Sequence, residues 1–175
     1  MRLRIRVDSM SQLRWYVDVS YCTHMDRKGN TGMIMTLGRG LSISFAQGQK
    51  LNVLSSTKGE LVGVNDTIPS IMWGKHFIGA QGYEVTDNIL YMDNKSTILL
   101  ATNIRASCSS NTKHIHCQYF AIKDLVDSGE ISIEHCPTEK MWADVLSKPL
   151  QGRPYKVMHV EQMNMDVDYN EKKEH

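Results

Sequence analysis

The feature that most constrains how this chain folds is a change in hydrophobic periodicity near residue 50. Before that point, three segments alternate apolar and polar side chains with the two-residue period of a β-strand, at 14–22, 31–37 and 41–45. Two short turn-forming stretches, DRKGN and GRG, separate these segments. Consecutive strands joined by such short turns pair with each other, so we predict a three-stranded antiparallel meander.

After residue 50, helices alternate with strands. Helical spacing of apolar residues predicts a helix over 57–82, which starts with the capping signal of Thr57 and Glu60 and is expected to kink or break at Pro69. The remaining predicted elements are a strand at 88–92, a helix from about 94, a helix at 113–129, a strand at 130–136 and a short helix at 139–148. This order predicts an α/β fold: a five-stranded mixed sheet, with the antiparallel meander and two parallel strands, flanked by helices.

Length and composition indicate a soluble domain of ordinary size. The 175 residues suffice for one domain with its own core, and the net charge of +1 excludes a global basic field for nucleic acid. Four cysteines without a CxxC pair indicate a reduced intracellular protein, and no apolar run approaches the roughly 18 residues of a membrane span. We expect a ragged lead-in at 1–13, the domain at 14–150 and a polar tail at 151–175 that frays.

Four carboxylates stand at unusual positions in this layout. Asp18 lies in the middle of the first strand, where aspartate is depleted, and Asp93 ends the fourth strand. Glu60 lies in the first turn of the long helix, and Asp144 lies in the last helix. If the first strand is central, Asp18 and Asp93 occupy adjacent strands, and the two helices can bring the other two acids to the same place.

Each acid also has an ordinary structural explanation. Asp18 would face water if its side of the sheet were open, and Glu60 would complete a capping box. Asp93 would cap the helix that follows it, and Asp144 would complement the dipole of the last helix. A shared site is the stronger joint interpretation, because gathered carboxylates repel each other unless a cation compensates them. Oxygen ligands select Mg²⁺ or Mn²⁺, and two such ions serve in-line displacement at phosphorus.

Four motifs resemble those of a known family: YVDVSY, SSTKGELVGV, YMDNKSTILL and TKHIHCQYFAIKDLVDSGEISIEHCPTEKMWADVLSKPLQG. The stretch from about Tyr16 to Leu150 resembles the ribonuclease H domain at the C-terminal end of copia-type LTR-retrotransposon polyproteins. The resemblance covers roughly three quarters of the chain, with the motifs in the expected order.

The resemblance implies a ribonuclease H-like fold and metal-dependent hydrolysis of the RNA strand of an RNA–DNA hybrid. It identifies Asp18, Glu60, Asp93 and Asp144 as the catalytic residues and as the ligands of two Mg²⁺ ions, for which Mn²⁺ can substitute. It also implies the hybrid as a partner, together with reverse transcriptase and integrase segments of a parent polyprotein. The expected place of action is intracellular, in the cytoplasm or the nucleus, with no membrane partner.

The chain departs from relatives of the family in two ways. Thr138 and Glu139 stand where many ribonucleases H carry a loop histidine, and His135 belongs to the preceding strand. A basic helical protrusion that holds substrate in some relatives is absent, so hybrid affinity must come from dispersed groups. The candidate substrate-binding residues are Ser56, Thr57, Asn94, Arg105, Lys113 and His114, with Lys123 as a further basic group. An ordinary solvated surface explains the basic residues equally well.

Three other functions are alternatives to hydrolysis of an RNA–DNA hybrid. A zinc-binding module would use Cys108, His114, His116, Cys117, His135 and Cys136, but these residues lack the tight pairs typical of zinc sites. A catalytically inactive or domesticated ribonuclease H fold would act as a nucleic-acid-binding or interaction module. An integrase-like DNA nuclease of related fold is disfavoured by the WADVLSKPL and SSTKGEL motifs.

Overall fold

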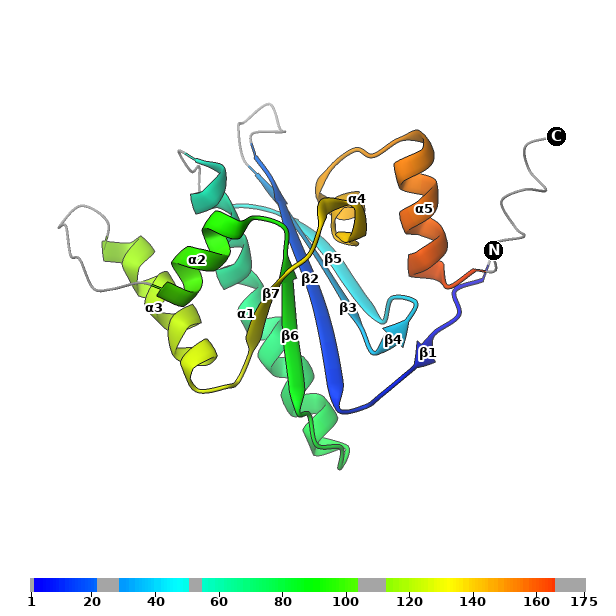
Figure 1. Ribbon diagram of the computed structural model, residues 1–175, viewed down its shortest axis with the longest axis horizontal. Coiled ribbons are helices and arrows are strands. Elements are labelled where there is room, and N and C mark those ends of the chain that lie inside the picture. Colours follow the sequence, from blue (N-terminus) through cyan, green and yellow to red (C-terminus); the bar gives the residue numbers. More distant parts are fainter. Residues whose placement is uncertain (1, 22–28, 51–54, 104–112, 166–175) are drawn as a thin grey trace.

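The core of the molecule is a five-stranded sheet with helices on both of its sides (Figure 1). The computed structural model describes residues 2–21, 29–50, 55–103 and 113–165, with the backbone alone for residue 103 and for 113–119. The strands of this sheet are β2 (Gln12–Ser20), β3 (Asn30–Thr36), β5 (Ile43–Gly48), β6 (Asp87–Met92) and β7 (Ser132–His135). A separate two-stranded sheet pairs β1 (Arg6–Val7) with β4 (Gly38–Arg39).

The strand order in the large sheet is β5-β3-β2-β6-β7, so the first strand of the predicted meander is central. β2 pairs antiparallel with β3, and β3 pairs antiparallel with β5. β2 pairs parallel with β6, and β6 pairs parallel with β7. The predicted mixed sheet of an antiparallel meander plus two parallel strands is therefore confirmed.

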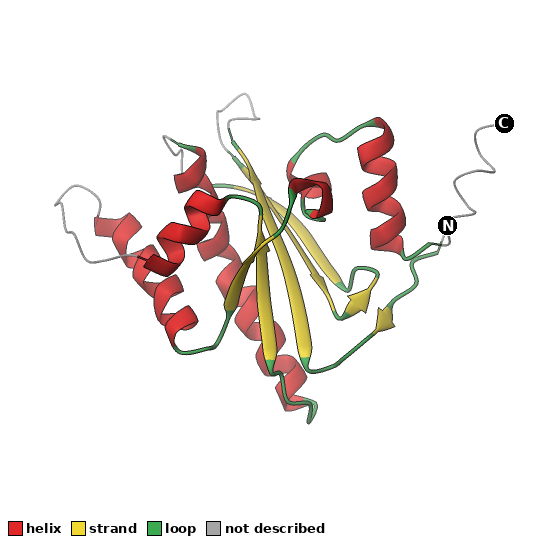
Figure 2. Cartoon of the chain, viewed as in Figure 1, coloured by secondary structure: helices red, strands yellow, loops and turns green. Residues whose placement is uncertain are grey.

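The helices form two groups on opposite sides of the sheet (Figure 2). They are α1 (Ser56–Ala80), α2 (Lys95–Asn103), α3 (Lys113–Asp127), α4 (Asp144–Ser147) and α5 (Gly152–Met163), with a 3₁₀ turn, η2 (Thr138–Lys140), before α4. α1, α2 and α3 cover the face that carries Trp15 and Val17, where the main apolar core lies. α4 and α5 lie on the other side, where a smaller cluster contains Cys136, Met141 and Ala143.

The long helix α1 differs from its prediction in two respects. Ser55 is the N-cap and accepts a hydrogen bond from the Lys58 amide at 3.3 Å, so the predicted start signal at Thr57 and Glu60 is wrong. Pro69 lies inside the helix without interrupting it. Its ring is exposed, so solvent can satisfy the carbonyl that loses its amide partner one turn back.

The C-terminal part is more ordered than the sequence indicated. The helix predicted at 139–148 divides into η2 and α4. The expectation that the tail frays is wrong for 152–163, which form α5, because Gln162 is buried and its side-chain amide donates to the Trp142 carbonyl at 2.7 Å. The N-terminal lead-in contributes β1, and the Arg4 amide donates to the Met163 carbonyl at 3.1 Å. The division into lead-in, domain and tail stays a prediction. Within the described ranges, no helix combines the length and apolarity needed to cross a membrane.

The contact between α1 and β2 gives a stability prediction. A Cβ added at Gly74 would lie 2.6 Å from Cζ2 of the fully buried Trp15, so Gly74→Ala should destabilise the fold by roughly 1–3 kcal/mol through overpacking. Gly79→Ala, in the same helix, meets nothing within 4 Å and should be neutral or stabilising by up to about 1 kcal/mol. Denaturant unfolding of both variants tests this prediction, and equal effects at the two positions would contradict it.

Candidate active site

The parallel pairing of β2 with β6 brings Asp18 and Asp93 to one edge of the sheet. The last residues that pair between β2 and β6 are Tyr16 and Tyr91, and each aspartate follows its tyrosine by two residues. Because side chains alternate along a strand, Asp18 lies on the same face as Tyr16. Asp93 directly follows Met92, the last residue of β6. Asp18 is only 4% exposed and Asp93 is half-buried, so the open-face explanation of Asp18 is wrong.

The helix α4 brings Asp144 to the same place. Asp144 is the first residue of α4 and is buried. Gly32 lies opposite Asp18 on β3, and a Cβ there would come within 2.8 Å of the Ala143 carbonyl oxygen and the Leu146 Cβ. The absence of a side chain at Gly32 therefore lets α4 lie directly on the sheet beside Asp18. Ligand oxygens of Asp18, Asp93 and Asp144 all lie within 4.8 Å of one another.

A lysine and a serine from the end of α4 contact these carboxylates. The Lys148 ammonium lies 2.9 Å from Oδ1 of Asp144 and 3.2 Å from Oδ1 of Asp18. The Ser147 hydroxyl donates a hydrogen bond to the other oxygen, Oδ2, of Asp18. The two most buried acids of the site are thus oriented by donors that follow Asp144 in the sequence. Thr138 of η2 donates to Oδ2 of Asp93 at 3.3 Å.

Burial and the neighbouring charges shift the pKa values of Asp144 and Lys148. Burial raises the pKa of Asp144 to about 6, because Lys148 offsets the burial only in part and Asp18 and Asp93 add negative charge. Burial also acts to lower the pKa of Lys148, but its hydrogen bond to Asp144 and the charge of Asp18 outweigh this effect and raise the pKa. The lysine is therefore held in its charged form.

Glu60 reaches the site from α1 and is held by the start of α2. Its two carboxylate oxygens accept hydrogen bonds from the Asn94 amide at 2.9 Å and from the Thr97 hydroxyl at 3.0 Å. Burial raises the pKa of Glu60; the two hydrogen bonds oppose this, and the charges of Asp93 and Asp18 add to it. Glu60 thus lies beside these aspartates but is not one of the three acids whose ligand oxygens converge.

Helix capping does not account for Glu60 or Asp93. Ser55 caps α1, as described above, which leaves the Glu60 side chain free of that role. At α2, the Asn94 side-chain oxygen accepts the amides of Ser96 and Thr97, at 2.9 and 3.3 Å. Asn94 is therefore the cap and Asp93 is not. Asp144 does begin its helix, as the dipole explanation requires, but it is also buried and ion-paired.

An aromatic stack beneath the carboxylates was missed by the sequence analysis. Tyr16 stacks on Tyr91 with ring centroids 5.0 Å apart, and on Trp142 with centroids 5.3 Å apart. Each of these rings stands two residues before one of the converging aspartates, in YVD, YMD and WAD. This repeated aromatic-x-Asp pattern is the signal from which the stack could have been found.

Among the predicted binding residues whose side chains are described, only Asn94 contacts a carboxylate of the site. Ser56 is exposed and Thr57 half-buried in the first turn of α1, whereas Asn94 contacts Glu60 directly. Arg105 lies outside the described residues, and the side chains of Lys113 and His114 are likewise not described, although both residues belong to α3. Lys123 pairs with Asp127 at 2.7 Å on the surface of α3.

The zinc interpretation gains no support from the described part of the chain. Among the described residues, the acids Asp18, Asp93 and Asp144 are the only group of potential metal ligands that converge. Cys136 is buried, and its burial, together with the charge of Asp93, raises its pKa to about 11. His135 is exposed at the end of β7. The remaining candidates, at 108, 114, 116 and 117, have no described side chains.

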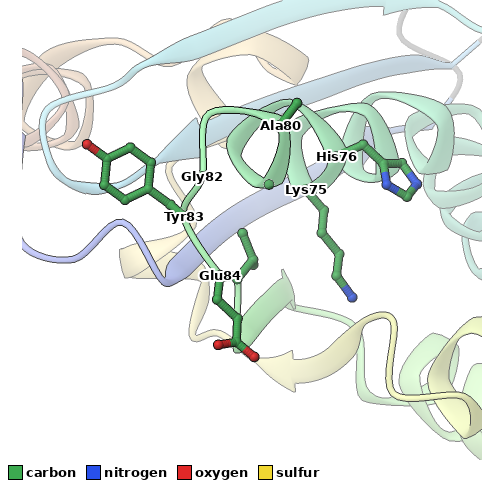
Figure 3. A pocket seen from close by; sticks show the side chains of 8 residues that line it. Lys75, His76, Ala80, Gly82, Tyr83 and Glu84 are labelled. Atoms are coloured by element: carbon green, nitrogen blue, oxygen red, sulfur yellow. The ribbon is translucent and has the colours of Figure 1, made fainter.

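A surface cavity of about 620 Å³ lies at the opposite end of β6 from Asp93. Lys75 and His76 of α1 line it together with Tyr83 and Glu84 of the segment that leads into β6 (Figure 3). Lys75 is paired with Glu130 at 2.7 Å. The cavity lacks the converging acids of the carboxylate site and is separate from it.

Comparison with curated proteins relates the chain to retrotransposon polyproteins. It is 31% identical over 140 residues, 79% of its length, to the retrovirus-related Pol polyprotein from transposon RE1 of Arabidopsis thaliana. It is 29% identical over 137 residues, 78% of its length, to the corresponding polyprotein from transposon TNT 1-94 of Nicotiana tabacum. The matches cover 9% and 10% of these relatives, so the chain corresponds to a small part of each. No family model matches the chain.

Comparison with solved structures identifies the fold. The structure of LC11 ribonuclease H1 in complex with an RNA/DNA hybrid matches with a TM-score of 0.54 at 13% identity, over 77% of this chain and 93% of that one. A structure of LC11 ribonuclease H1 isolated from compost matches with a TM-score of 0.50 at 17% identity, over 78% and 92%. The chain is therefore a homologue of one segment of copia-type retrotransposon Pol polyproteins, and it has the ribonuclease H fold.

Proposed function

We propose that this chain is an active ribonuclease H that hydrolyses the RNA strand of an RNA–DNA hybrid with the help of divalent metal ions. The observation that carries the proposal is the convergence of Asp18, Asp93 and Asp144 on one edge of the sheet. The homology to retrotransposon Pol polyproteins and the ribonuclease H fold support it. A reverse transcriptase and an integrase segment of a parent polyprotein are the proposed partners, and the proposed place of action is intracellular.

The donor set fits hard divalent cations. The three converging ligands are all carboxylate oxygens, which Mg²⁺ and Mn²⁺ prefer, and Glu60 stands beside them as the proposed fourth ligand. Two ions in such a site would generate the attacking hydroxide and stabilise the leaving oxygen of an in-line displacement. The expected products carry 3′-hydroxyl and 5′-phosphate ends.

The protein's own contribution is to hold the acids in place and to present the hybrid to them. Ser147 and Lys148 orient Asp18 and Asp144, and Thr138 contacts Asp93, so these ligands are positioned before a metal arrives. Asn94 and Thr97 hold Glu60 in the same way. Ser56 and Thr57, in the first turn of α1, are the proposed polar contacts to the hybrid, and recognition of the 2′-hydroxyl would distinguish RNA from DNA.

The catalytic claim is tested by removing one charge from the site. Asp93→Asn should reduce Mg²⁺-dependent cleavage of the RNA strand in a labelled hybrid by about 10³-fold or more, because an amide is a much weaker ligand for the metal. Asp87→Asn is the matched control: it alters an exposed aspartate at the other end of β6 and should cleave like wild type. If the wild-type protein cuts no hybrid in Mg²⁺ or Mn²⁺ but still binds it, the inactive binding module is the correct interpretation.

Metal binding predicts a pH-dependent gain in thermal stability. Millimolar Mg²⁺ should raise the melting temperature at about pH 7, and Asp144→Asn should largely abolish this increase, because the metal binds only the folded site. The gain should shrink as the pH falls through about 6, since protons compete with the metal for Asp144.

In EDTA the contribution of Asp144 has the opposite sign: its folded pKa is raised, so this contribution to stability is lost as the pH rises through about 6. Calorimetry of both proteins in EDTA and in Mg²⁺ measures these effects, and a pH-independent Mg²⁺ effect would contradict the prediction.

A further inference from the structure

The position of Lys148 carries an inference about the metal site, which rests on the proposed function. The lysine follows α4 directly and adopts an extended backbone, with φ −124° and ψ 145°, as expected for a residue before a proline. Its backbone amide donates to the Asp144 carbonyl at 2.9 Å. From this position its side-chain ammonium contacts Asp144 and Asp18 at once.

The burial of the partners makes these two ion pairs costly to break. The side chains of Asp18 and Asp144 are only 3% and 5% exposed, whereas that of Lys148 is 34% exposed. Removing one partner of a buried pair is costly because the remaining charge has lost its water. The two aspartates therefore depend on the lysine for charge compensation as long as no other cation is present.

We propose that Lys148 is a resident counter-ion of the site, which neutralises Asp18 and Asp144 in the metal-free protein and is displaced from them when a divalent ion binds. Lys148 and the metal would compete for the same carboxylate oxygens, so the lysine weakens metal affinity while it stabilises the metal-free fold. The partial exposure of the side chain gives the displaced ammonium a path into solvent. Its long aliphatic stem allows this movement without a change in the backbone.

Three substitutions separate competition from a merely structural role. Lys148→Met keeps most of the length of the side chain without its charge, and it should lower the melting temperature in EDTA. It should also tighten the binding of Mn²⁺ about tenfold, an effect between those typical of exposed and of buried ion pairs. Lys148→Arg keeps the charge and should bind Mn²⁺ like wild type. Lys140→Met, at an exposed position in η2, removes the same charge nearby and should change the affinity much less. Isothermal titration of each protein with Mn²⁺ alone, without nucleic acid, gives these affinities.

A measurement on the wild-type protein keeps the inference testable if Lys148→Met does not fold. Reductive methylation followed by peptide mass spectrometry reports how accessible each amine is. Saturating Mn²⁺ should increase labelling of Lys148 several-fold relative to EDTA, with Lys140 as the internal reference.

The possible results distinguish this inference from the proposed function. Tighter Mn²⁺ binding by Lys148→Met, or increased labelling of Lys148 in Mn²⁺, supports the inference. Measurable wild-type binding that is unchanged or weakened in Lys148→Met, or labelling that Mn²⁺ does not increase, overturns the inference and leaves the metal-dependent function standing. If neither the wild type nor the variant binds Mn²⁺, both the metal dependence and the inference fail.

Discussion

The parallel register between β2 and β6 is the constraint on which the site depends. Tyr16 pairs with Tyr91, so Asp18 within β2 and Asp93 just after β6 lie at the same edge of the sheet. A slip of one residue would turn one of the two strands over and place its aspartate in the apolar core against α1. The register is set by side chains that the site never uses, such as Trp15 on β2 and Leu90 on β6, which are fully buried on the opposite face. Core packing on one side of the sheet therefore determines the geometry of the acids on the other.

The aromatic stack extends this control to the segment that carries Asp144. That segment belongs to no strand of the sheet, so strand pairing cannot position it. Trp142 stacks on Tyr16, and the small residue Gly32 admits α4 against β3. Stacked rings have preferred geometries, and their burial adds to the stability of the contact. Two contacts at the two ends of one short segment thus fix Asp144 relative to Asp18, with the ring two residues before the acid and the helix after it.

Much of this fold follows from local patterns, and the parts that do not have identifiable physical causes. The strand periodicities and short turns were enough to predict the mixed sheet, and the proximity of Asp18 and Asp93 followed on the condition that the first strand is central, which the strand order meets. The cap of α1 was misplaced because two hydroxyl residues, Ser55 and Thr57, offer similar signals, and only the tertiary position of the helix decides between them. The α5 helix was missed because its apolar stripe is weak and its anchor is a polar one, the hydrogen bond from Gln162 to Trp142. The role of Lys148 depends on a backbone turn that no periodicity reports.

The donors that compensate the acids are exchanged between motifs. In YMDNKST, Asn94 and Thr97 come one and four residues after Asp93, and they donate hydrogen bonds to Glu60 of α1 rather than to Asp93. In WADVLSK, Ser147 and Lys148 come three and four residues after Asp144, and both contact Asp18 of β2. Each motif thus supplies one acid and also the hydrogen-bond donors for an acid on another element. An acid buried in this site without the hydrogen-bond donors from another element would be partly desolvated and uncompensated, at a cost in folding free energy. Full compensation of the carboxylates therefore requires all their elements to have docked, which links assembly of the site to completion of the fold.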